Sequence, residues 1–522
     1  MSGLARTLAV TLTGLQGHLV QVEAHASQGL PGFTLVGLPD AAVRESRERV
    51  RAALSTCGTA WGERRVTANL SPADLPKTGT GFDLSLALAV LGARQELSLQ
   101  AIEAMAGTVF IGELGLDASV RPVRGVLPAV SCAAAAGVRR IVVPQDCLAE
   151  ARLVPGIEVR PVAHLAELIT QLGGKVPAGV LALARHAGQG HAPATASSPP
   201  PAAADLADVV GQHEARHALE VAAAGGHHLL LVGPPGAGKT MMAERLPSIL
   251  PPLSTADSIT VTSLHSVAGT FNAEAGLIRT PPLRSPHHTA TRAAVVGGGS
   301  GTPRPGDVSL AHRGVLFLDE APEFSSGVLD CLRQPLETGQ VTIDRAGGRA
   351  TYPAAFQLVL AANPCPCGRG SGRGTQCTCT SLQRRRYFSR LSGPLLDRVD
   401  IQVEVAAISS TDLAGGGVGE SSARVAARVL AARARTARRL ADTPWRLMSQ
   451  VPGSWLRSPQ SGTDRAGVRL LLDALDRGDL TLRGVDRVLR LAWTLADLAG
   501  LDGPGKAELG AALALRTRGG RP

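Results

Sequence analysis

The segment GPPGAGKT at residues 233–240 limits the fold of this 522-residue chain more than any other feature. It follows the apolar run LLLV and precedes a helix-compatible stretch, so the pattern G-x-x-x-x-G-K-[ST] stands in a strand–loop–helix context. In such a loop, glycines let the backbone approach the phosphates, the lysine meets the β and γ oxygens, and the hydroxyl binds Mg²⁺. The sequence therefore predicts an α/β P-loop core that binds ATP and Mg²⁺ through Gly233, Pro234, Pro235, Gly236, Ala237, Gly238, Lys239, Thr240 and Met241.

Two further apolar runs end in polar residues that fit the same site. In VLFLDE, residues 315–320, Asp319 is expected to hold Mg²⁺ through water and Glu320 to orient the attacking water. Asn363 ends the run LVLAAN, and open α/β sheets bind ligands at the carboxyl ends of their strands, so it is expected to sense the γ-phosphate. The alternatives are a solvated acidic turn and an Asn that caps the turn before Pro364.

Composition and apolar patterning divide the chain into three parts joined by a linker. Residues 183–204 are rich in Ala, Pro, Ser and Gly without hydrophobic periodicity, as is typical of linkers. Residues 1–182 indicate an α+β domain, residues 205–408 a parallel sheet with crossovers, and residues 409–522 a helical lid. We predict amino-terminal strands at 7–12, 34–37, 65–70, 109–112 and 140–143 with helices at 41–55 and 84–93, core strands at 229–232, 259–262, 315–318, 358–361 and 401–405, and lid helices at 422–440, 466–475 and 485–499.

Two segments of the core extend beyond what a minimal sheet needs. Asp319 follows Thr240 by 79 positions, which is long for one helix, one strand and their loops. We therefore interpret residues 279–306, rich in Pro, Gly, His and Arg, as a functional insert. Residues 341–352, VTIDRAGGRATY, predict a hairpin with Arg345 and Arg349 beside its tip. Both segments could face a ligand other than ATP.

The charge balance favours a polyanionic partner. Lys and Arg number 53 against 43 Asp and Glu, which gives a net charge of +10, although many Arg-rich proteins are basic without touching DNA. Aromatic residues make up only 3% of the chain, which argues against single-strand binding by base stacking and leaves arginine contacts with the backbone. No apolar run reaches the ~18 residues of a membrane helix, and the first residues do not form a signal peptide, so we expect a cytoplasmic protein with no membrane partner.

Four of the eight cysteines lie in one Gly-rich loop, CPCGRGSGRGTQCTC. Four thiolates could bind structural Zn²⁺, although Cys-x-Cys differs from the usual Cys-x-x-Cys spacing, and free or redox-active thiols are the alternative. The ligands would be Cys365, Cys367, Cys377 and Cys379. The isolated Cys57, Cys132, Cys147 and Cys331 are expected to be ordinary buried residues.

Long blocks of the sequence resemble the ComM/YifB family of magnesium-chelatase-like AAA+ ATPases over nearly the whole chain. The blocks include GLPDAAVRESRERVRAAL, NLSPADLPKTGTGFDLSLAL, RSPHHTATRAAVVGGGS, SLAHRGVLFLDEAPEF, LRQPLETGQVTIDRA, AANPCPCG and RLSGPLLDRVDI. The resemblance implies a ring-forming homo-oligomer, described as a hexamer, that uses ATP to drive branch migration of DNA during natural transformation. Its partner would then be branched or single-stranded DNA.

The resemblance also assigns roles to individual residues. Lys239 and Thr240 match the Walker A loop, Asp319 and Glu320 match Walker B, and Asn363 matches sensor 1. Arg398 matches the arginine finger that would reach the nucleotide of the next subunit, and by itself it is equally consistent with a surface ion pair beside Asp397. The remaining assignments are Arg483 as sensor 2, Val210, Gly211 and Gln212 near the adenine, and Arg345 and Arg349 as DNA contacts in the pore-facing hairpin.

The amino-terminal domain resembles the Lon protease domain but carries Gly81 where that domain has its serine and Leu127 where it has its lysine. A Ser-Lys pair cannot form from these positions, so we predict no peptidase activity. Alternatives for the whole chain are a magnesium chelatase motor subunit and a protein-remodelling AAA+ ATPase. In the lid, a shared helical face presents basic side chains that fit a phosphate-tracking stripe or, more simply, a solvated face: Arg424, Arg428, Arg435 and Arg439.

Overall fold

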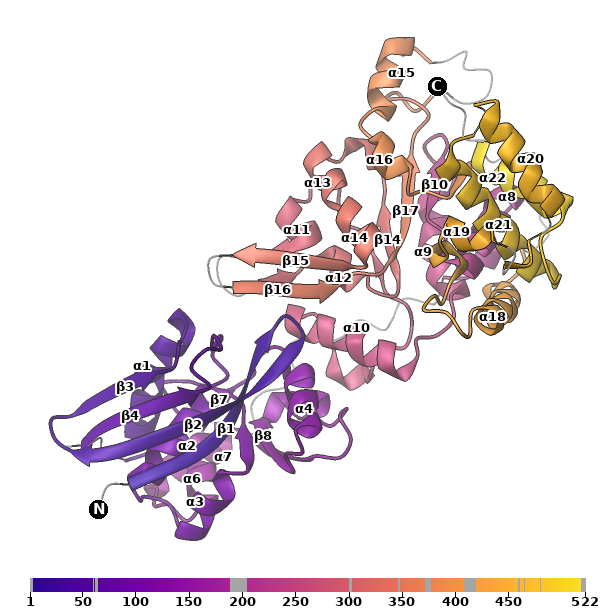
Figure 1. Ribbon diagram of the computed structural model, residues 1–522. Coiled ribbons are helices and arrows are strands. Elements are labelled where there is room, and N and C mark those ends of the chain that lie inside the picture. Colours follow the sequence, from indigo (N-terminus) through magenta and orange to yellow (C-terminus); the bar gives the residue numbers. More distant parts are fainter. Residues whose placement is uncertain are drawn as a thin grey trace.

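The computed structural model describes residues 3–517 except 60, 62–63, 188–203, 300–302, 346–347, 371–376, 408–418, 459–460, 464 and 479. In Figure 1 the amino-terminal part lies at the lower left, the P-loop core above it, and the carboxyl-terminal helices at the right. Most of the predicted linker lies outside the described residues. Its start at residue 183 is wrong, because the helix-forming run AGVLALARHA continues as α7 (Ala178–Ala187).

A mixed seven-stranded sheet forms the amino-terminal part, in the order β3-β4-β2-β1-β5-β8-β9. The predicted strands there are confirmed, whereas β2, the partner of β1 in a long antiparallel hairpin, was missed although its QGHLVQVEAHASQ alternates buried and less buried residues. Helix α2 is buried at every position, as its apolar sequence requires. The strands are β1 (Gly3–Thr13), β2 (Gln16–Gln28), β3 (Gly32–Val36), β4 (Arg64–Ser71), β5 (Thr108–Phe110), β8 (Arg140–Pro144) and β9 (Glu158–Val162), and the main helices are α1 (Ala41–Thr56), α2 (Asp83–Ala93), α3 (Leu99–Met105), α4 (Val126–Ala135) and α6 (Leu165–Gln171).

The core sheet is parallel throughout, with the order β11-β14-β17-β10-β18. Its three central strands are short apolar runs buried almost throughout, as expected for a sheet covered on both faces, whereas β11 and β18 at its two edges are less buried. Because all strands point the same way, the residues that follow β10, β14 and β17 meet at one edge. The strands are β10 (Leu229–Val232), β11 (Leu283–Arg284), β14 (Val315–Leu318), β17 (Gln357–Ala362) and β18 (Ile401–Glu404).

The predicted strand at 259–262 is wrong, because this segment lies inside helix α10 (Thr255–Ala268). The run SITV favours a strand by local propensity, but helix-capping signals surround it. The Ser254 hydroxyl accepts the Asp257 N–H at the start of the helix, and Gly269 ends it in the left-handed conformation. The edge strand is instead β11, within the predicted insert, so the first part of that segment belongs to the sheet.

The insert and the predicted hairpin pack against each other. The insert continues through α11 (Arg292–Val296), and the hairpin consists of β15 (Gln340–Arg345) and β16 (Gly348–Pro353) in antiparallel register. The Tyr352 hydroxyl donates to the Pro303 carbonyl over 2.6 Å. Helix α10 also contacts the amino-terminal part, where the Ser266 hydroxyl donates to Glu150 over 2.5 Å (Figure 1). The two halves of the chain therefore meet at the root of the insert.

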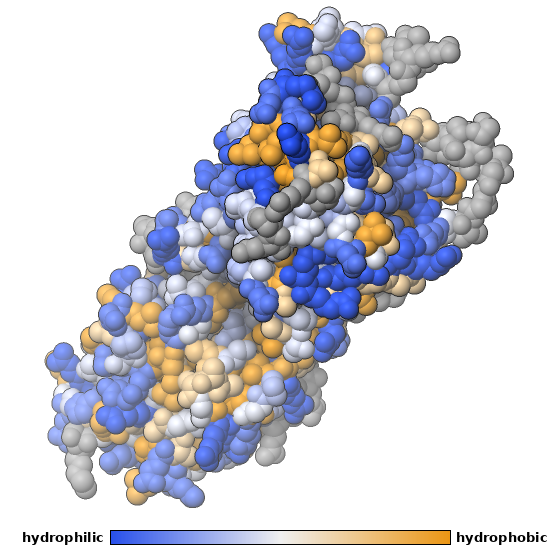
Figure 2. Space-filling model, turned by 45° about the vertical axis from the view of Figure 1, so that its right-hand side comes forward, coloured by the Kyte–Doolittle hydropathy of each residue, from blue (hydrophilic) through white to orange (hydrophobic). Residues whose placement is uncertain are grey.

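The carboxyl-terminal helices pack on α8 (His213–Gly225) and α9 (Lys239–Ile249) of the core (Figure 1). The space-filling view shows hydrophilic residues over much of one face and a group of apolar residues on the lower lobe, which is the amino-terminal part (Figure 2). Among the described residues, no helix is both long enough and apolar enough to cross a membrane. The predicted lid helices are confirmed as α18 (Ser422–Arg439), α20 (Arg465–Asp476) and α21 (Leu482–Ala499), followed by α22 (Lys506–Thr517).

A buried polar network joins the core to the lid. Asp400, just before β18, lies 3.2 Å from Nδ1 of His227, whose Nε2 is 2.8 Å from the Thr494 hydroxyl of α21. Asp400 also lies 3.5 Å from Nε of Arg487. Burial by itself raises the pKa of Asp400, but the hydrogen bond with His227 and nearby positive charges hold that pKa below its usual range. The network fixes α21 to the strand end that carries Asp400.

Replacing Asp400 with alanine is expected to destabilise the core–lid unit by about 3–5 kcal/mol, because Arg487 stays buried without its carboxylate. Urea unfolding followed by tryptophan fluorescence measures this, since Trp445, Trp455 and Trp493 all lie in the lid. The matched control is Arg424→Ala, which breaks an exposed ion pair with Glu420 and should cost less than ~1 kcal/mol. If both variants lose the same free energy of unfolding, the buried network around Asp400 does not stabilise the core–lid unit as proposed.

Candidate functional site

Lys239 stands at the centre of the predicted phosphate site. Its Nζ donates to the carbonyls of Gly233 and Pro234 at 2.6 and 2.9 Å and to Oδ1 of Asn363 at 3.2 Å. Burial lowers the pKa of Lys239, while the carboxylates of Asp319 and Glu320 act in the opposite direction. The structure therefore brings together residues from the ends of three strands, as expected from the parallel sheet.

The acidic pair lies beside the P-loop threonine. The Thr240 hydroxyl donates to Oδ2 of Asp319 over 2.7 Å, and the other oxygen of Asp319 accepts the Glu320 N–H at 2.8 Å. Hydroxyl and carboxylate oxygens are ligands that Mg²⁺ accepts, so Thr240 and Asp319 could hold the ion directly or through water. Glu320 has φ +49°, a left-handed backbone conformation that is uncommon outside glycine and concentrates at functional sites.

The P-loop glycines serve two different purposes. Gly236 and Gly238 have φ of +77° and +88°, where a side chain would be strained. A Cβ at Gly233 would lie 2.3 Å from the Val405 carbonyl oxygen, so this glycine permits close packing against the strand beside it. The prediction that Gly233 also lets the backbone approach the phosphates stays a prediction.

The residues predicted to lie near the adenine precede α8. Gln212 takes a left-handed φ of +54° and donates to the carbonyls of Ala406 at 2.6 Å and Ala237 at 3.4 Å. Ala237 belongs to the P-loop, so Gln212 joins the segment of Val210 and Gly211 to the phosphate site. This arrangement fits a segment that borders a bound nucleotide.

His288 is a site residue that the sequence did not predict. This insert residue places Nδ1 at 3.4 Å from Oε2 of Glu320, and its ring packs against His287 with centroids 4.1 Å apart. The His-His pair within RSPHHTATR was visible in the sequence, but its distance from Glu320 along the chain concealed the contact. The insert thus reaches the acidic pair of the same subunit.

Arg398 and the P-loop lie at opposite ends of the parallel strands. In the register of β18 with β10, Ile401 pairs with Leu229 and Glu404 with Val232, so Arg398 precedes the strand start while the P-loop follows the strand end. The four-residue strand separates them by about 13 Å. Arg398 forms an ion pair with Glu337.

Arg483 of α21 lies on the same side as Arg398, with its guanidinium 3.2 Å from the neighbouring Asp397. Arg398 and Arg487 also line a cavity of about 930 Å³ between core and lid. The structure therefore groups Arg398 and Arg483 with each other, away from the P-loop end of β10.

Basic residues proposed for DNA contact have different environments. Arg349 is exposed on the hairpin, 3.5 Å from Asp344, while the side chain of Arg345 and the hairpin tip lie outside the described residues. The four arginines of the lid stripe all have partners within the protein; Arg424 and Arg428 are nevertheless exposed, as the solvated interpretation predicts, and the phosphate-tracking interpretation stays a prediction. Arg428 pairs with Glu220 and Glu420, Arg435 donates to the Asp497 carbonyl, Arg439 pairs with Asp497, and Arg424 pairs with Glu420.

The positions that match the peptidase pair of Lon provide no nucleophile. Gly81 has no side chain, and Leu127 is fully buried, with its N–H donating to Glu150 over 2.7 Å. Burial raises the pKa of Glu150, which also accepts the Ser266 hydroxyl. Leu127 therefore lies at the contact between the amino-terminal part and α10.

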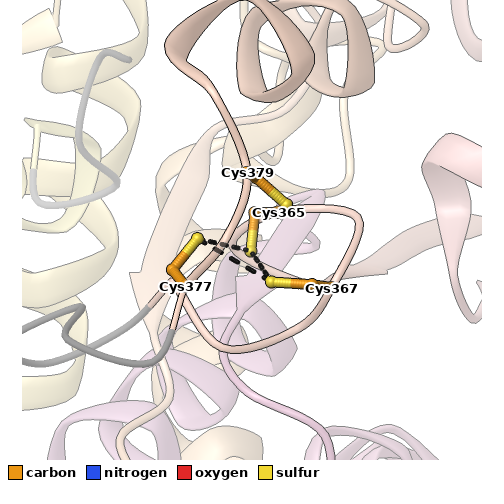
Figure 3. Close-up of side chains that lie close together, drawn as sticks. All are labelled: Cys365, Cys367, Cys377 and Cys379. Carbon is orange, nitrogen blue, oxygen red and sulfur yellow. Dashed lines mark hydrogen bonds between the residues drawn. The ribbon is translucent and has the colours of Figure 1, made fainter.

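The four clustered cysteines converge on one another (Figure 3), and their loop lies beside the P-loop, where Gly368 packs on Pro235. Their sulfur atoms all lie within 4.8 Å of one another, which is a donor set that could bind Zn²⁺. The backbone N–H of Arg369 lowers the pKa of the Cys367 thiol to about 6. Of the isolated cysteines, Cys57 and Cys147 are buried as expected, whereas Cys132 and Cys331 are partly exposed.

Sequence comparisons match the whole chain to one group of proteins. Residues 205–413 match the family model of magnesium chelatase, subunit ChlI; residues 22–147 match subunit ChlI of Mg-chelatase, and residues 419–516 match its C-terminal part. An uncharacterized protein of Mycobacterium tuberculosis is 50% identical over 99% of both chains. Escherichia coli YifB is 39% identical over 93% of this chain and 91% of its own, and Haemophilus influenzae competence protein ComM is 38% identical over 93% and 92%.

Proposed function

Because this chain belongs to the magnesium chelatase ChlI-like family, together with YifB and ComM, we propose that it is a ring-forming ATPase that remodels branched DNA. Its ChlI-like core implies ATP hydrolysis. Beyond ATP hydrolysis, we propose that the chain assembles into a ring, acts on DNA and drives branch migration of recombination intermediates. The observation that supports the DNA substrate most is the relation to a competence protein over 93% of the chain.

The nucleotide chemistry follows from the residues at the sheet edge. Lys239 donates hydrogen bonds and positive charge where the β and γ oxygens would lie, and Thr240 with Asp319 would hold Mg²⁺, which neutralises charge developing on the phosphates. Glu320 would orient the attacking water and accept its proton. Asn363, whose Oδ1 accepts a hydrogen bond from Lys239, would donate its amide N–H groups to the γ-phosphate.

A ring is proposed because Arg398, which matches the family's arginine finger, lies at the opposite end of the strands from the P-loop of its own subunit. Arg398 lies beyond the opposite end of β10, so it cannot reach the phosphates of its own subunit. The same position suits contact with a neighbour's nucleotide, where its charge would stabilise the transition state. We propose six copies by analogy with the family.

DNA would contact the insert and hairpin. Arg349 is exposed on β16, and the chain as a whole carries a net charge of +10. Contacts of this kind bind the phosphate backbone without reading sequence, which suits a motor that moves along DNA. For the amino-terminal part we propose a Lon-like fold without peptidase activity, since Gly81 and Leu127 provide neither nucleophile nor base.

The test is a labelled four-way DNA junction incubated with the protein, ATP and Mg²⁺, with ATP turnover measured in the same tubes. We expect forked products and faster turnover with junction DNA than without DNA, and neither with Lys239→Ala. A simple duplex serves as the control substrate. If unfolded protein stimulates ATP turnover and DNA does not, the DNA proposal is contradicted and the protein is a protein-remodelling ATPase.

A further inference from the structure

We infer that Cys365, Cys367, Cys377 and Cys379 bind one structural Zn²⁺ ion, and that this ion braces the nucleotide site. The metal assignment stands on the geometry of the thiols alone. The bracing role rests on the proposed ATPase function, because its effect is read in nucleotide binding and turnover.

The sulfur separations match a single tetrahedral ion. Cys365 lies 3.3 Å from Cys367 and 3.6 Å from Cys377, and Cys367 lies 3.7 Å from Cys377. A Zn–S bond of about 2.3 Å gives a tetrahedron whose edges are about 3.8 Å, so a zinc ion fits with little movement of the sulfurs. Disulfide sulfurs lie about 2.05 Å apart, so the cluster is not two disulfides.

The loop is shaped to hold the thiols in this arrangement (Figure 3). Gly368 makes a turn with φ +75°, directly after the first Cys-x-Cys pair. A Cβ at Gly370 would lie 3.0 Å from the Cys365 sulfur, so glycine leaves the space that this buried sulfur needs. Four thiolates around one divalent cation leave an excess negative charge, which the adjacent Arg369 reduces.

The cluster adjoins the phosphate site on two sides. Cys365 follows Asn363 by two positions, and Asn363 accepts a hydrogen bond from Lys239. On the other side the loop packs on the P-loop itself, because a Cβ at Gly368 would lie 2.7 Å from Cγ of Pro235. A metal that fixes this loop therefore fixes both Asn363 and Pro235.

The second Cys-x-Cys pair anchors helix α15 (Ser381–Phe388). Thr380, next to Cys379, caps this helix in a reciprocal capping box with Gln383. Burial raises the pKa of Tyr387 of α15 to about 12, and the nearby Asn363 backbone N–H acts in the opposite direction. Arg390, just beyond α15, donates to Glu323 at 2.9 Å, three residues after Glu320. The ion would thus join the start of α15 to the end of β17, while the other end of α15 contacts both the sensor and the acidic turn.

The experiment compares the full chain with a Cys377→Ser/Cys379→Ser variant and a Cys331→Ser control. Elemental analysis should find about one zinc per wild-type and control chain and less than about 0.2 in the double variant, since two thiolates alone do not hold structural zinc. Replacing zinc with Co²⁺ should give the intense thiolate-to-cobalt absorption of a four-sulfur site. Iron instead of zinc, or no metal in the wild type, would overturn the assignment.

The bracing role is measured on the same proteins after circular dichroism has shown that the double variant is folded. We expect its ATP turnover to fall about tenfold or more, because small displacements of positioned groups have large kinetic effects. Turnover within about twofold of the control, with zinc lost, would overturn the brace and leave the ATPase proposal intact. A wild type that holds zinc without any turnover would refute the proposed function and leave the metal site standing.

Discussion

Replacing Glu320 with glutamine is expected to lower ATP turnover at least ~100-fold, while ATP affinity stays within about threefold of wild type. The change removes the carboxylate that orients and deprotonates water but leaves Lys239, Thr240 and Asp319, which hold the nucleotide and Mg²⁺. Glu320 is half-exposed, and among the described residues its side chain makes no hydrogen bond to the backbone. The substitution should therefore leave the fold intact. Turnover is measured by phosphate release and affinity with a fluorescent ATP analogue.

The control for this experiment is Glu274→Gln, which changes an exposed carboxylate in the loop after α10 and should leave turnover unchanged. Lys239→Ala provides the contrast, because it should lose affinity as well as turnover. If the Glu320→Gln variant keeps wild-type turnover, another group must activate the water. The assignment of the acidic pair would then have to be revised.

Replacing Arg398 with alanine is expected to lower turnover about 1,000-fold without loss of nucleotide binding. Arg398 lies at the opposite end of the strands from the P-loop, so under the proposed function it acts at the nucleotide of a neighbouring subunit. The deciding measurement mixes Arg398→Ala with Lys239→Ala subunits. In mixed rings a Lys239→Ala neighbour supplies Arg398 to an intact P-loop, so part of the activity should return although each variant alone is inactive.

Mixing that restores nothing would contradict action between subunits. Sedimentation must show that each variant and the mixture assemble like the wild type, because a failure to assemble would imitate the loss. Arg438→Ala, which removes an exposed lid arginine, is the matched control and should keep full turnover.

The nucleotide site was predictable because its determinants are local. Lys239, Asp319 and Asn363 each follow a short apolar run, and the parallel sheet rule brings the ends of such runs together. The predicted zinc ligands share this property, because four cysteines within fifteen residues of one loop lie close together in space.

What the sequence did not reveal depends on contacts between distant segments. The SITV run became helical because Ser254 and Gly269 cap a longer segment, so capping outweighed strand propensity. The basic face of α18 became an ion-paired surface because Glu220, some 200 positions earlier, packs against Arg428. Nothing local to either residue shows that pairing.

The contact between His288 and Glu320 gives the insert a direct connection to hydrolysis. The insert packs on the hairpin through Tyr352 and adjoins α10, which meets the amino-terminal part at Glu150. If the proposed function holds, the residue that contacts the acidic pair belongs to the same insert that would meet DNA, so DNA bound there would lie next to the hydrolysis site of the same subunit.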